Sequence, residues 1–353
     1  MRCGATLTGA SVAYETWGGL NAAADNALLL FTGLSPSAHA ASSGDDISEG
    51  WWEAVIGPGK AIDTDHYFVI CVNSLGSCFG STGPASIDPA TGTAWRLCFP
   101  ALAIEDITRA AEVVIASLGI RRLAAVAGPS LGGMAALAFV ALFPGRARRL
   151  ISISGTDAAS PMAIALRSVQ REAILRDPEW RDGNYAPQHP PRNGLRLARK
   201  LGTITYRSAR EWNQRFARRR QQDPLAPGGG AFAPEFAIEA YLEVQAERFA
   251  DLFDANCYLY LSRAMDRFDL AEHAASGTIR DVFKAAGLEA ALVIGVETDL
   301  LFPIAEQARI AAALEAAAVP VNFCRLDSRE GHDAFLVDID AIALPLRRFL
   351  AQA

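Results

Sequence analysis

Short apolar runs alternate with longer segments of helical periodicity along most of this chain. Apolar runs of about four to eight residues between turn residues predict buried strands, whereas apolar positions recurring every three or four residues predict helices. Helices are expected at 101–118 and after 133. Strands alternating with helices favour an α/β fold around a mainly parallel sheet. The expected strands are 12–16, 27–31, 67–72, 123–126, 150–154, 291–296 and 321–326.

One of these strands runs directly into a Gly-x-Ser-x-Gly sequence that contains Gly128, Ser130 and Gly132, and a good helix former follows. Strand, tight turn and helix form the context of a nucleophile elbow, in which the serine hydroxyl stands above the sheet edge at a helix N-terminus. An ordinary glycine-rich turn is the alternative. The motif alone does not decide between them.

Two further residues decide it, because an acid and a histidine follow in the order of an α/β-hydrolase. Asp299 comes just after the expected strand 291–296, and His332 follows the strand 321–326. The order Ser130, Asp299, His332 predicts a catalytic triad in which the histidine takes the serine proton and the aspartate orients the imidazole. A surface carboxylate and an ordinary loop histidine are the alternatives, but they do not explain these positions.

The pattern changes between residues 155 and 277, where helical periodicity dominates and strand signals almost vanish. A loop is expected at 224–230, and one or two helices at 236–268. We therefore predict an α/β-hydrolase core in two parts, 1–154 and 278–353. A helical lid, 155–277, is inserted between them and covers the serine.

The same fold predicts an oxyanion hole made of backbone N–H groups. One would come from Leu131, directly after the nucleophile. The other would come from Phe31 or Thr32, at the end of an early strand. A plain loop is the alternative at the second position.

Composition narrows the class of protein further. The chain has 353 residues, 51% of them hydrophobic, and its net charge of −6 comes without acidic or basic blocks, which argues against a nucleic-acid partner. An apolar run of about 18 residues and a signal peptide are both missing, so a cytoplasmic enzyme without a membrane partner is expected. The cysteines are scattered and are expected to be mostly buried, reduced thiols. The histidines outside the triad share no ligand spacing, so no metal site is predicted; they are His39, His66, His189 and His273.

By its motifs the chain resembles the homoserine O-acyltransferase family over nearly its whole length. This resemblance implies a homodimer whose lid helices pack together, and acyl transfer from an acyl-CoA co-substrate to an amino-acid hydroxyl, with no bound cofactor. The matching segments are 67–73, 80–84, 128–134, 254–260 and 331–336.

The resemblance also assigns two binding residues. Arg199, within 198–206, matches the arginine that binds the amino-acid carboxylate, a task suited to a planar fork donor. Asp333 matches the contact to the substrate amino group. A solvated arginine and a loop carboxylate are the respective alternatives.

The chain departs from the homoserine acetyltransferase pattern in two places. Gly33, Leu34, Ser35 and Pro36 stand where that pattern has Gly-Asp-Ser-His, and this altered loop is expected to shorten the acceptor pocket. Arg167 stands where acetyltransferases usually have Asn, and a second cation near the acyl site suits a donor with a free carboxylate. A lid-surface arginine is the alternative for Arg167. Both departures resemble the branch that succinylates L-serine for cysteine synthesis.

The sequence thus predicts an L-serine O-succinyltransferase that works through a Ser130 acyl-enzyme. A homoserine O-acetyltransferase or O-succinyltransferase of methionine synthesis is the close rival, because one methylene contributes only about 1–3 kcal/mol of discrimination. An esterase with the same triad and a catalytically silent binding protein are rivals from other classes.

Overall fold

A seven-stranded sheet forms the centre of the protein, whose computed structural model describes residues 1–221 and 232–352. Its strands are β1 (Tyr14–Trp17), β2 (Ala27–Phe31), β5 (Phe68–Val72), β6 (Leu123–Pro129), β7 (Ala147–Ile153), β8 (Ala290–Val296) and β9 (Val321–Leu326). The spatial order is β1-β5-β2-β6-β7-β8-β9, with β1 antiparallel to β5 and every other neighbouring pair parallel.

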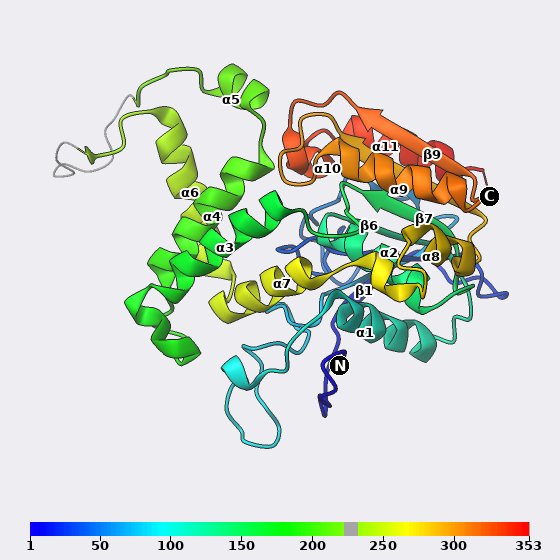
Figure 1. Cartoon of the computed structure of the whole chain (residues 1–353), viewed down its shortest axis with the longest axis horizontal. Helices are drawn as coiled ribbons and strands as arrows, with labels where there is room; N and C mark the ends of the chain where they lie inside the picture. Colours follow the sequence, from blue (N-terminus) through cyan, green and yellow to red (C-terminus); the bar gives the residue numbers. More distant parts are fainter. Residues whose placement is uncertain (222–231, 353) are drawn as a thin grey trace.

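Both faces of this sheet are buried, which explains why its central strands are continuous apolar runs rather than alternating ones. In β2, Leu29 and Phe31 belong to one core, and Leu28 and Leu30 to the other. The first core is covered by α1 (Ile104–Ser117), α2 (Leu131–Leu142), α8 (Ile279–Ala286) and α9 (Ile304–Ala316). The second is covered by α11 (Ile339–Leu350) and by the chain around Trp52 (Figure 1).

Between β7 and β8 the chain leaves the sheet and forms helices. They are α3 (Pro161–Leu175), η2 (Pro178–Gly183), α4 (Arg192–Tyr206), α5 (Ala209–Arg215), α6 (Ala237–Leu252), α7 (Ala255–Arg267) and η4 (Leu270–His273). We call the described residues of 155–277, that is 155–221 and 232–277, the helical segment. In Figure 1, α3, α4 and α6 lie together beside one end of the sheet, and α7 leads back towards α2.

Charge pairing aligns two of these helices. Arg192, Arg196 and Lys200 stand four residues apart on α4, and their side chains pair with Glu243 and Glu247 on α6. A spacing of four residues puts side chains on one face of a helix. The complementary rows therefore fix α4 against α6.

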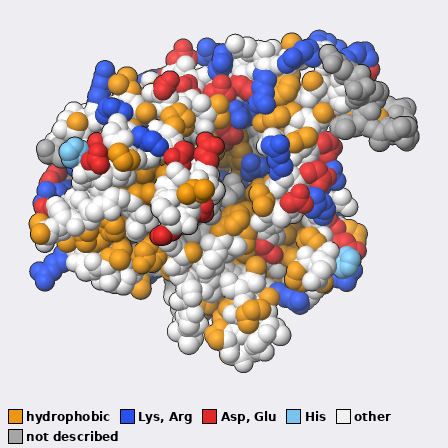
Figure 2. Space-filling view, turned by 180° about the vertical axis from the view of Figure 1, so that it is seen from behind, with side chains coloured by type: hydrophobic (Ala, Val, Ile, Leu, Met, Phe, Trp, Pro, Cys, Tyr) orange, Lys and Arg blue, Asp and Glu red, His pale blue; other side chains and the backbone are white. Residues whose placement is uncertain are grey.

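On the face of the molecule shown in Figure 2, basic and acidic side chains are interspersed.

Most expected elements are present, with corrected ends. β6 extends through Pro129 rather than stopping at Val126, because Gly128 and Pro129 pair with Ser152 and Ile153 of β7. The region 236–268 forms two helices, broken between Leu252 and Ala255. The expected loop at 224–230 lies outside the described residues. Short elements that the sequence did not predict are β3 (Ile56–Gly57), β4 (Ile62–Asp63), η1 (Arg96–Cys98), η5 (Gly331–Asp333) and α10 (Ala334–Val337).

The expectation of mostly buried cysteines needs a correction. Cys71 and Cys257 are buried, but Cys3 and Cys98 are exposed, and all six thiols are free. None of the helices in the described part of the chain is both long enough and apolar enough to cross a bilayer.

Candidate active site

Ser130 lies at the sharp turn between β6 and α2. Its backbone has φ 56° and ψ −119°, a conformation that residues other than glycine rarely adopt. The turn requires glycine on both sides: a Cβ on Gly128 would stand 2.2 Å from the Gly132 carbonyl oxygen, and one on Gly132 would stand 2.5 Å from that of Phe31. The motif glycines therefore allow β2, β6 and α2 to meet, and the strained turn places the buried Ser130 at the N-terminus of α2.

The structure brings Ser130, Asp299 and His332 into one hydrogen-bonded chain. His332 Nε2 is 2.8 Å from Ser130 Oγ, and its Nδ1 is 2.7 Å from Asp299 Oδ2. The other oxygen of Asp299 accepts the backbone N–H groups of Leu301 and Phe302, at 2.8 and 2.9 Å. The carboxylate is thus fixed by backbone donors and can in turn orient the imidazole, as proton transfer from a serine requires.

The environment of His332 favours its protonated form. Burial alone lowers the pKa of this imidazole, but the charge of Asp299 and its hydrogen bond outweigh burial and raise the pKa above its ordinary value. The rings of Phe302 and Phe335 pack edge-on to the imidazole, and the ring of Tyr206 lies 5.8 Å from it. A histidine that is held in place and readily accepts a proton is suited to act as a general base.

The expected oxyanion donors lie close to this serine. Leu131 opens α2, where the first N–H groups have no acceptor within the helix. Phe31 is the last residue of β2 and Thr32 the first beyond it. The close approach of Gly132 to the carbonyls of both residues places this strand end against the start of α2.

A narrow cavity of about 20 Å³ adjoins the serine. This volume is close to that of one water molecule. Leu34 lines it, whereas Gly33, Ser35 and Pro36 of the expected acceptor loop do not. The lining side chains are those of Leu34, Ser130, Arg167, Gln170, Tyr206, Tyr258, Met265 and Leu301. Most of them come from the helical segment, and apart from Leu34, Ser130 and Arg167 none was singled out from the sequence.

Arg167 reaches this cavity as a buried cation, only 4% exposed, and not as a lid-surface arginine. Its Nε donates to Asp266 Oδ1 at 2.6 Å, and the other oxygen of Asp266 is paired with Arg171 Nη2 at 2.6 Å. Arg171 Nη1 donates to Ser262. Within the described residues, both terminal nitrogens of Arg167 are buried without a hydrogen-bond partner. Two arginines share one carboxylate, so the cluster carries an excess positive charge beside Ser130.

Arg199 lies on α4 but is not among the residues that line the cavity. Its guanidinium carbon stands 4.7 Å from the ring centre of Phe249 and 5.7 Å from that of Tyr206. Cation–π attraction at these distances helps to hold the guanidinium beside the two rings. Its Nε is buried and has no partner among the described residues. Its charge nevertheless reaches the site, because it lowers the pKa of Asp333.

Asp333 follows His332 directly and is paired with an arginine that the sequence did not single out. Arg207 Nε lies 3.2 Å from Asp333 Oδ2. Burial raises the pKa of this carboxyl group above its ordinary value, while Arg207, His332 and Arg199 act in the opposite direction. Arg207 belongs to none of the matched motifs, which is why sequence reasoning missed it.

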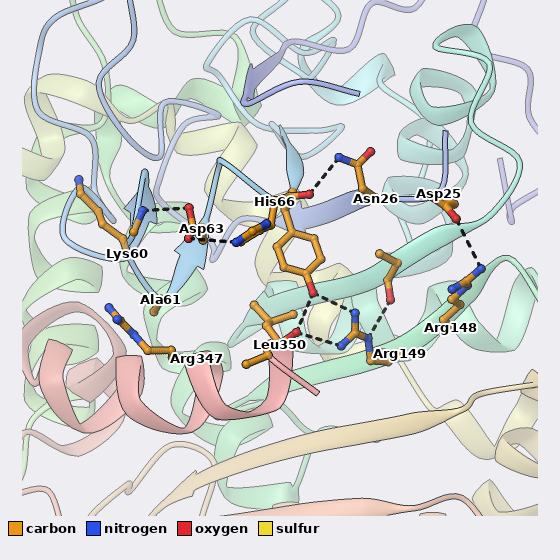
Figure 3. A pocket seen from close by; sticks show the side chains of 14 residues that line it. Asp25, Asn26, Lys60, Ala61, Asp63, His66, Arg148, Arg149, Arg347 and Leu350 are labelled. Atoms are coloured by element: carbon orange, nitrogen blue, oxygen red, sulfur yellow. Dashed lines mark hydrogen bonds and ion pairs between the residues drawn. The ribbon is translucent and has the colours of Figure 1, made fainter. Parts of the chain in front are cut away.

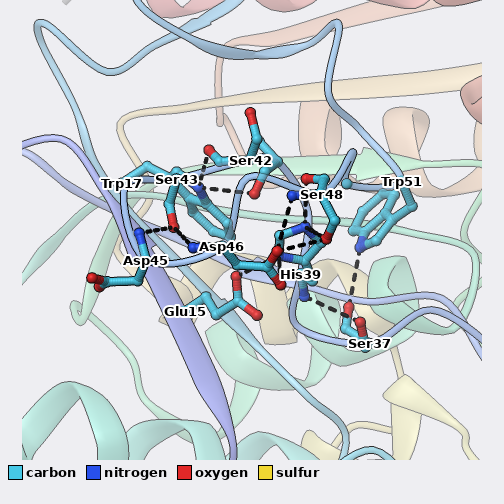
Figure 4. A network of polar contacts seen from close by, with 12 residues as sticks. Glu15, Trp17, Ser37, His39, Ser42, Ser43, Asp45, Asp46, Ser48 and Trp51 are labelled. Carbon is cyan, nitrogen blue, oxygen red and sulfur yellow. Dashed lines mark hydrogen bonds and ion pairs between the residues drawn. The ribbon is translucent and has the colours of Figure 1, made fainter.

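A polar network holds the loop that follows β2 (Figure 4). His39 Nδ1 lies 2.8 Å from Glu15 Oε2, and its Nε2 lies 2.9 Å from the Ser48 carbonyl oxygen. Trp51 Nε1 donates to the Ser37 carbonyl at 3.1 Å. These contacts hold the loop, whose first part includes Leu34, a lining residue of the cavity beside Ser130.

A wider cavity of about 610 Å³ lies at the opposite end of the sheet (Figure 3). Most of its lining residues precede or open the strands, and the others come from the end of α11, whereas Ser130 follows a strand. Arg149 donates there to the Phe349 and Leu350 carbonyls at 3.4 Å and to Tyr67 Oη at 3.0 Å. It thereby gives hydrogen-bond donors to carbonyl groups at the C-terminal end of α11. We interpret these contacts as structural. Among the described residues, no group of three or more His, Cys, Asp or Glu side chains could hold a metal ion.

Comparison with known proteins agrees with this geometry. Residues 26–339 match the model of the alpha/beta hydrolase fold family. The chain belongs to that family. It is 55% identical to a serine O-succinyltransferase of Litchfieldella anticariensis, over 99% of this chain and 95% of that one. It is also 54% identical to an L-serine/homoserine O-acetyltransferase of Streptomyces lavendulae, over 99% and 94%.

Solved structures are similar over the same length. The homoserine O-acetyltransferase of Bacillus anthracis aligns with a TM-score of 0.87 and 29% identity, covering 96% of this chain and 91% of that one. Esterase E22 aligns with a TM-score of 0.86 and 30% identity, covering 97% and 94%. The chain is therefore an acyltransferase of the homoserine O-acyltransferase family, most like its serine O-succinyltransferase branch.

Proposed function

We propose that this enzyme is an L-serine O-succinyltransferase, which moves a succinyl group from succinyl-CoA to the hydroxyl of L-serine. The single observation that carries the choice of donor is that Arg167, which lines the cavity beside Ser130, has two buried terminal nitrogens without a hydrogen-bond partner among the described residues. A buried guanidinium needs acceptors, and a carboxylate accepts its parallel N–H groups in a bidentate pair. The distal carboxylate of a succinyl group fits this requirement, and an acetyl group has no such atom.

The reaction begins with attack of Ser130 Oγ on the thioester carbonyl carbon. His332 takes the hydroxyl proton, and the N–H groups of Leu131 and of Phe31 or Thr32 stabilise the oxyanion. When the C–S bond breaks, the CoA sulfur receives the proton from His332. The product of this half-reaction is a succinyl ester on Ser130.

The second half-reaction repeats these steps with the amino acid as nucleophile. His332 removes the proton of the substrate hydroxyl, whose oxygen attacks the ester carbonyl carbon, and Ser130 leaves with that proton. Arg199 binds the acceptor carboxylate, and Asp333 binds its ammonium group. Leu34 and its neighbours Gly33, Ser35 and Pro36 limit the length of the acceptor side chain.

The helical segment acts as a lid over both half-reactions. Arg167, Tyr206, Tyr258 and Met265 all reach the cavity from it, and the cavity of about 20 Å³ is smaller than a succinyl group. The segment must therefore move away from Ser130 when the acyl group enters. Its return excludes water, which favours transfer to an amino acid over hydrolysis.

Assembly and location complete the proposal. We expect a cytoplasmic homodimer formed through the helical segment, where Val169, Leu197 and Val244 expose 54%, 56% and 44% of their surface on α3, α4 and α6. A mass of one chain in light scattering at micromolar concentration would contradict the dimer.

An esterase is the second candidate, because esterase E22 shares the fold at 30% identity. The decisive experiment is a matrix of succinyl-CoA or acetyl-CoA against L-serine, L-homoserine or water. We expect succinyl-CoA with L-serine to give the highest kcat/KM, and CoA release without an amino acid to be slow. A higher kcat/KM with acetyl-CoA would refute succinyl-CoA as the donor, and a higher kcat/KM with L-homoserine would refute L-serine as the acceptor. Fast hydrolysis without an amino acid would refute the transferase and favour the esterase.

A further inference from the structure

The linker between α4 and α5 lies directly on the loop that carries His332. It consists of Arg207 and Ser208, between the helix ends at Tyr206 and Ala209. A Cβ on Gly331 would stand 2.8 Å from the Tyr206 carbonyl oxygen and 3.0 Å from the Ser208 nitrogen, so two backbones are in contact here. Gly331 also has φ +67°, which favours glycine.

Arg207 pairs with both ends of the short loop around His332. Its Nη1 donates to Glu330 Oε2 at 2.8 Å, and its Nε lies 3.2 Å from Asp333 Oδ2. The side chain of Arg207 is 10% exposed, so these charges attract each other with little screening by solvent. One guanidinium therefore bridges the residue before Gly331 and the residue after His332.

The loop has other attachments that do not involve Arg207. Ser208 Oγ donates to the Arg329 carbonyl oxygen and accepts the Glu211 N–H at 3.1 Å. Gly331 donates its N–H to Thr298 Oγ1 at 3.2 Å. His332 itself is held by Asp299. We therefore expect His332 to stay in place when Arg207 is lost, and the main change to be in the position of the Asp333 carboxylate.

We propose that Arg207 is a positioning residue for the amino-acid acceptor: its ion pair with Asp333 fixes that carboxylate where it binds the substrate ammonium group. This inference rests on the proposed function, in which Asp333 contacts the acceptor. Arg207 supports the second half-reaction, whereas the first, which needs no acceptor, does not depend on it.

The charges that face Asp333 explain why it needs this partner. Asp333 lies near Asp299, which raises its pKa as burial does, and near His332 and Arg199, which lower it. Of the cations that act on it, Arg207 has the largest effect. Arg199 is assigned to the acceptor carboxylate, and His332 changes its charge during the reaction. Arg207 is the cation left to hold Asp333 throughout.

The test is Arg207→Met, which keeps an unbranched apolar stem and removes the charged guanidinium. We expect kcat/KM for L-serine to fall about ten- to a hundredfold, as for the loss of a charged hydrogen bond. The burst of CoA release on mixing with succinyl-CoA alone should change less than about threefold, because it reports only acylation of Ser130. Arg207→Lys, which keeps the charge, should recover part of the loss.

An acceptor without an amino group sharpens the result. 3-Hydroxypropanoate has the hydroxyl and carboxylate of serine but no ammonium group. Arg207→Met should change kcat/KM for this acceptor little, so the ratio of kcat/KM for L-serine to that for 3-hydroxypropanoate should fall. The matched control is Arg210→Met, which removes an exposed arginine of α5 whose partner is Asp327. Its kinetics should equal those of the wild type.

Equal loss in the burst and in transfer to L-serine would overturn the proposal, because Arg207 would then only support the fold. Unchanged transfer to L-serine would overturn it as well. A wild-type enzyme that releases CoA from succinyl-CoA in a burst but accepts no amino acid would instead refute the proposed function, before any variant is compared.

Discussion

The two sides of the candidate site are built in different ways. On the sheet side, Ser130, Asp299 and His332 follow β6, β8 and β9 and are held largely by backbone geometry. On the helical side, Arg167 and Arg207 are held by ion pairs with Asp266, Glu330 and Asp333. Turns and strand ends are enough to position the residues of the sheet side. The residues of the helical side are positioned only when side chains from distant elements meet.

Arg167 and Arg207, both on the helical side, differ from each other in how their charge is compensated. Arg207 lies between two carboxylates, so its charge is compensated within the protein. Arg167 shares one carboxylate with Arg171, and in the part of the chain that the structure describes two of its nitrogens have no hydrogen-bond partner. A compensated cation positions its neighbours, and an uncompensated one is available to a ligand. We infer that the sheet side determines the chemistry and the helical side determines the substrates.

The largest expected effect breaks the sheet side. Ser130→Ala should lower kcat for succinyl transfer on the order of 10⁴- to 10⁶-fold, because the nucleophile is lost while the helical side stays intact. Mass spectrometry after mixing with succinyl-CoA should show a succinyl adduct on Ser130 in the wild type and none in the variant. Substantial turnover by Ser130→Ala, or an adduct on a cysteine, would rule out the acyl-enzyme.

The same contrast explains what the sequence can predict. Ser130, Asp299 and His332 each follow an apolar run, so local pattern and chain order were enough to select them and the fold. The extension of β6 through Gly128 and Pro129 was not predictable from propensity, because pairing with β7 overrides the weak strand preference of both residues. The two-residue strands β3 and β4 are too short to give a pattern.

The ion pairs of the helical side carry no local signal at all. Arg167 and Asp266 are 99 residues apart in the chain, and Arg207 and Glu330 are 123 apart. Charged residues are frequent throughout the helical segment, and most of them are solvated. Only the packing of α3 on α7, and of the α4–α5 linker on the His332 loop, distinguishes these arginines from the others.

The second largest effect changes the donor. Arg167→Asn should lower kcat/KM for succinyl-CoA relative to acetyl-CoA between about thirtyfold and a thousandfold, because the succinyl carboxylate would enter a buried site without a counter-charge. Asp266 keeps Arg171 as a partner, so the fold should tolerate the change. Arg248→Asn, an exposed arginine of α6, is the control. An unchanged ratio of the two donors would remove Arg167 from donor selection.

A smaller effect concerns the acceptor. Arg199→Ala should raise KM for L-serine about ten- to a hundredfold and leave KM for succinyl-CoA nearly unchanged, because the lost interaction is a charged hydrogen bond to the amino-acid carboxylate. Arg196→Ala is the control on the same helix, since Arg196 pairs with Glu243 and Glu247. If Arg199→Ala damages both KM values equally, the residue serves to pack Phe249 and Tyr206 instead.

The smallest expected effect is on the pKa of His332, a residue of the sheet side on which Arg167 of the helical side acts through its charge. Burial lowers the pKa of this imidazole, Asp299 reverses that and raises it, and Arg167 opposes Asp299 through its own charge. The general base must be neutral, so activity falls as pH drops through this raised pKa. Arg167→Asn removes a cation that disfavours protonation, and the pKa of His332 should rise further. The acidic limb of kcat/KM with acetyl-CoA, a donor without the distal carboxylate, should therefore move to higher pH in Arg167→Asn and stay in place in Arg248→Asn. A limb that moves to lower pH would mean that Arg167 does not act on His332 through its charge.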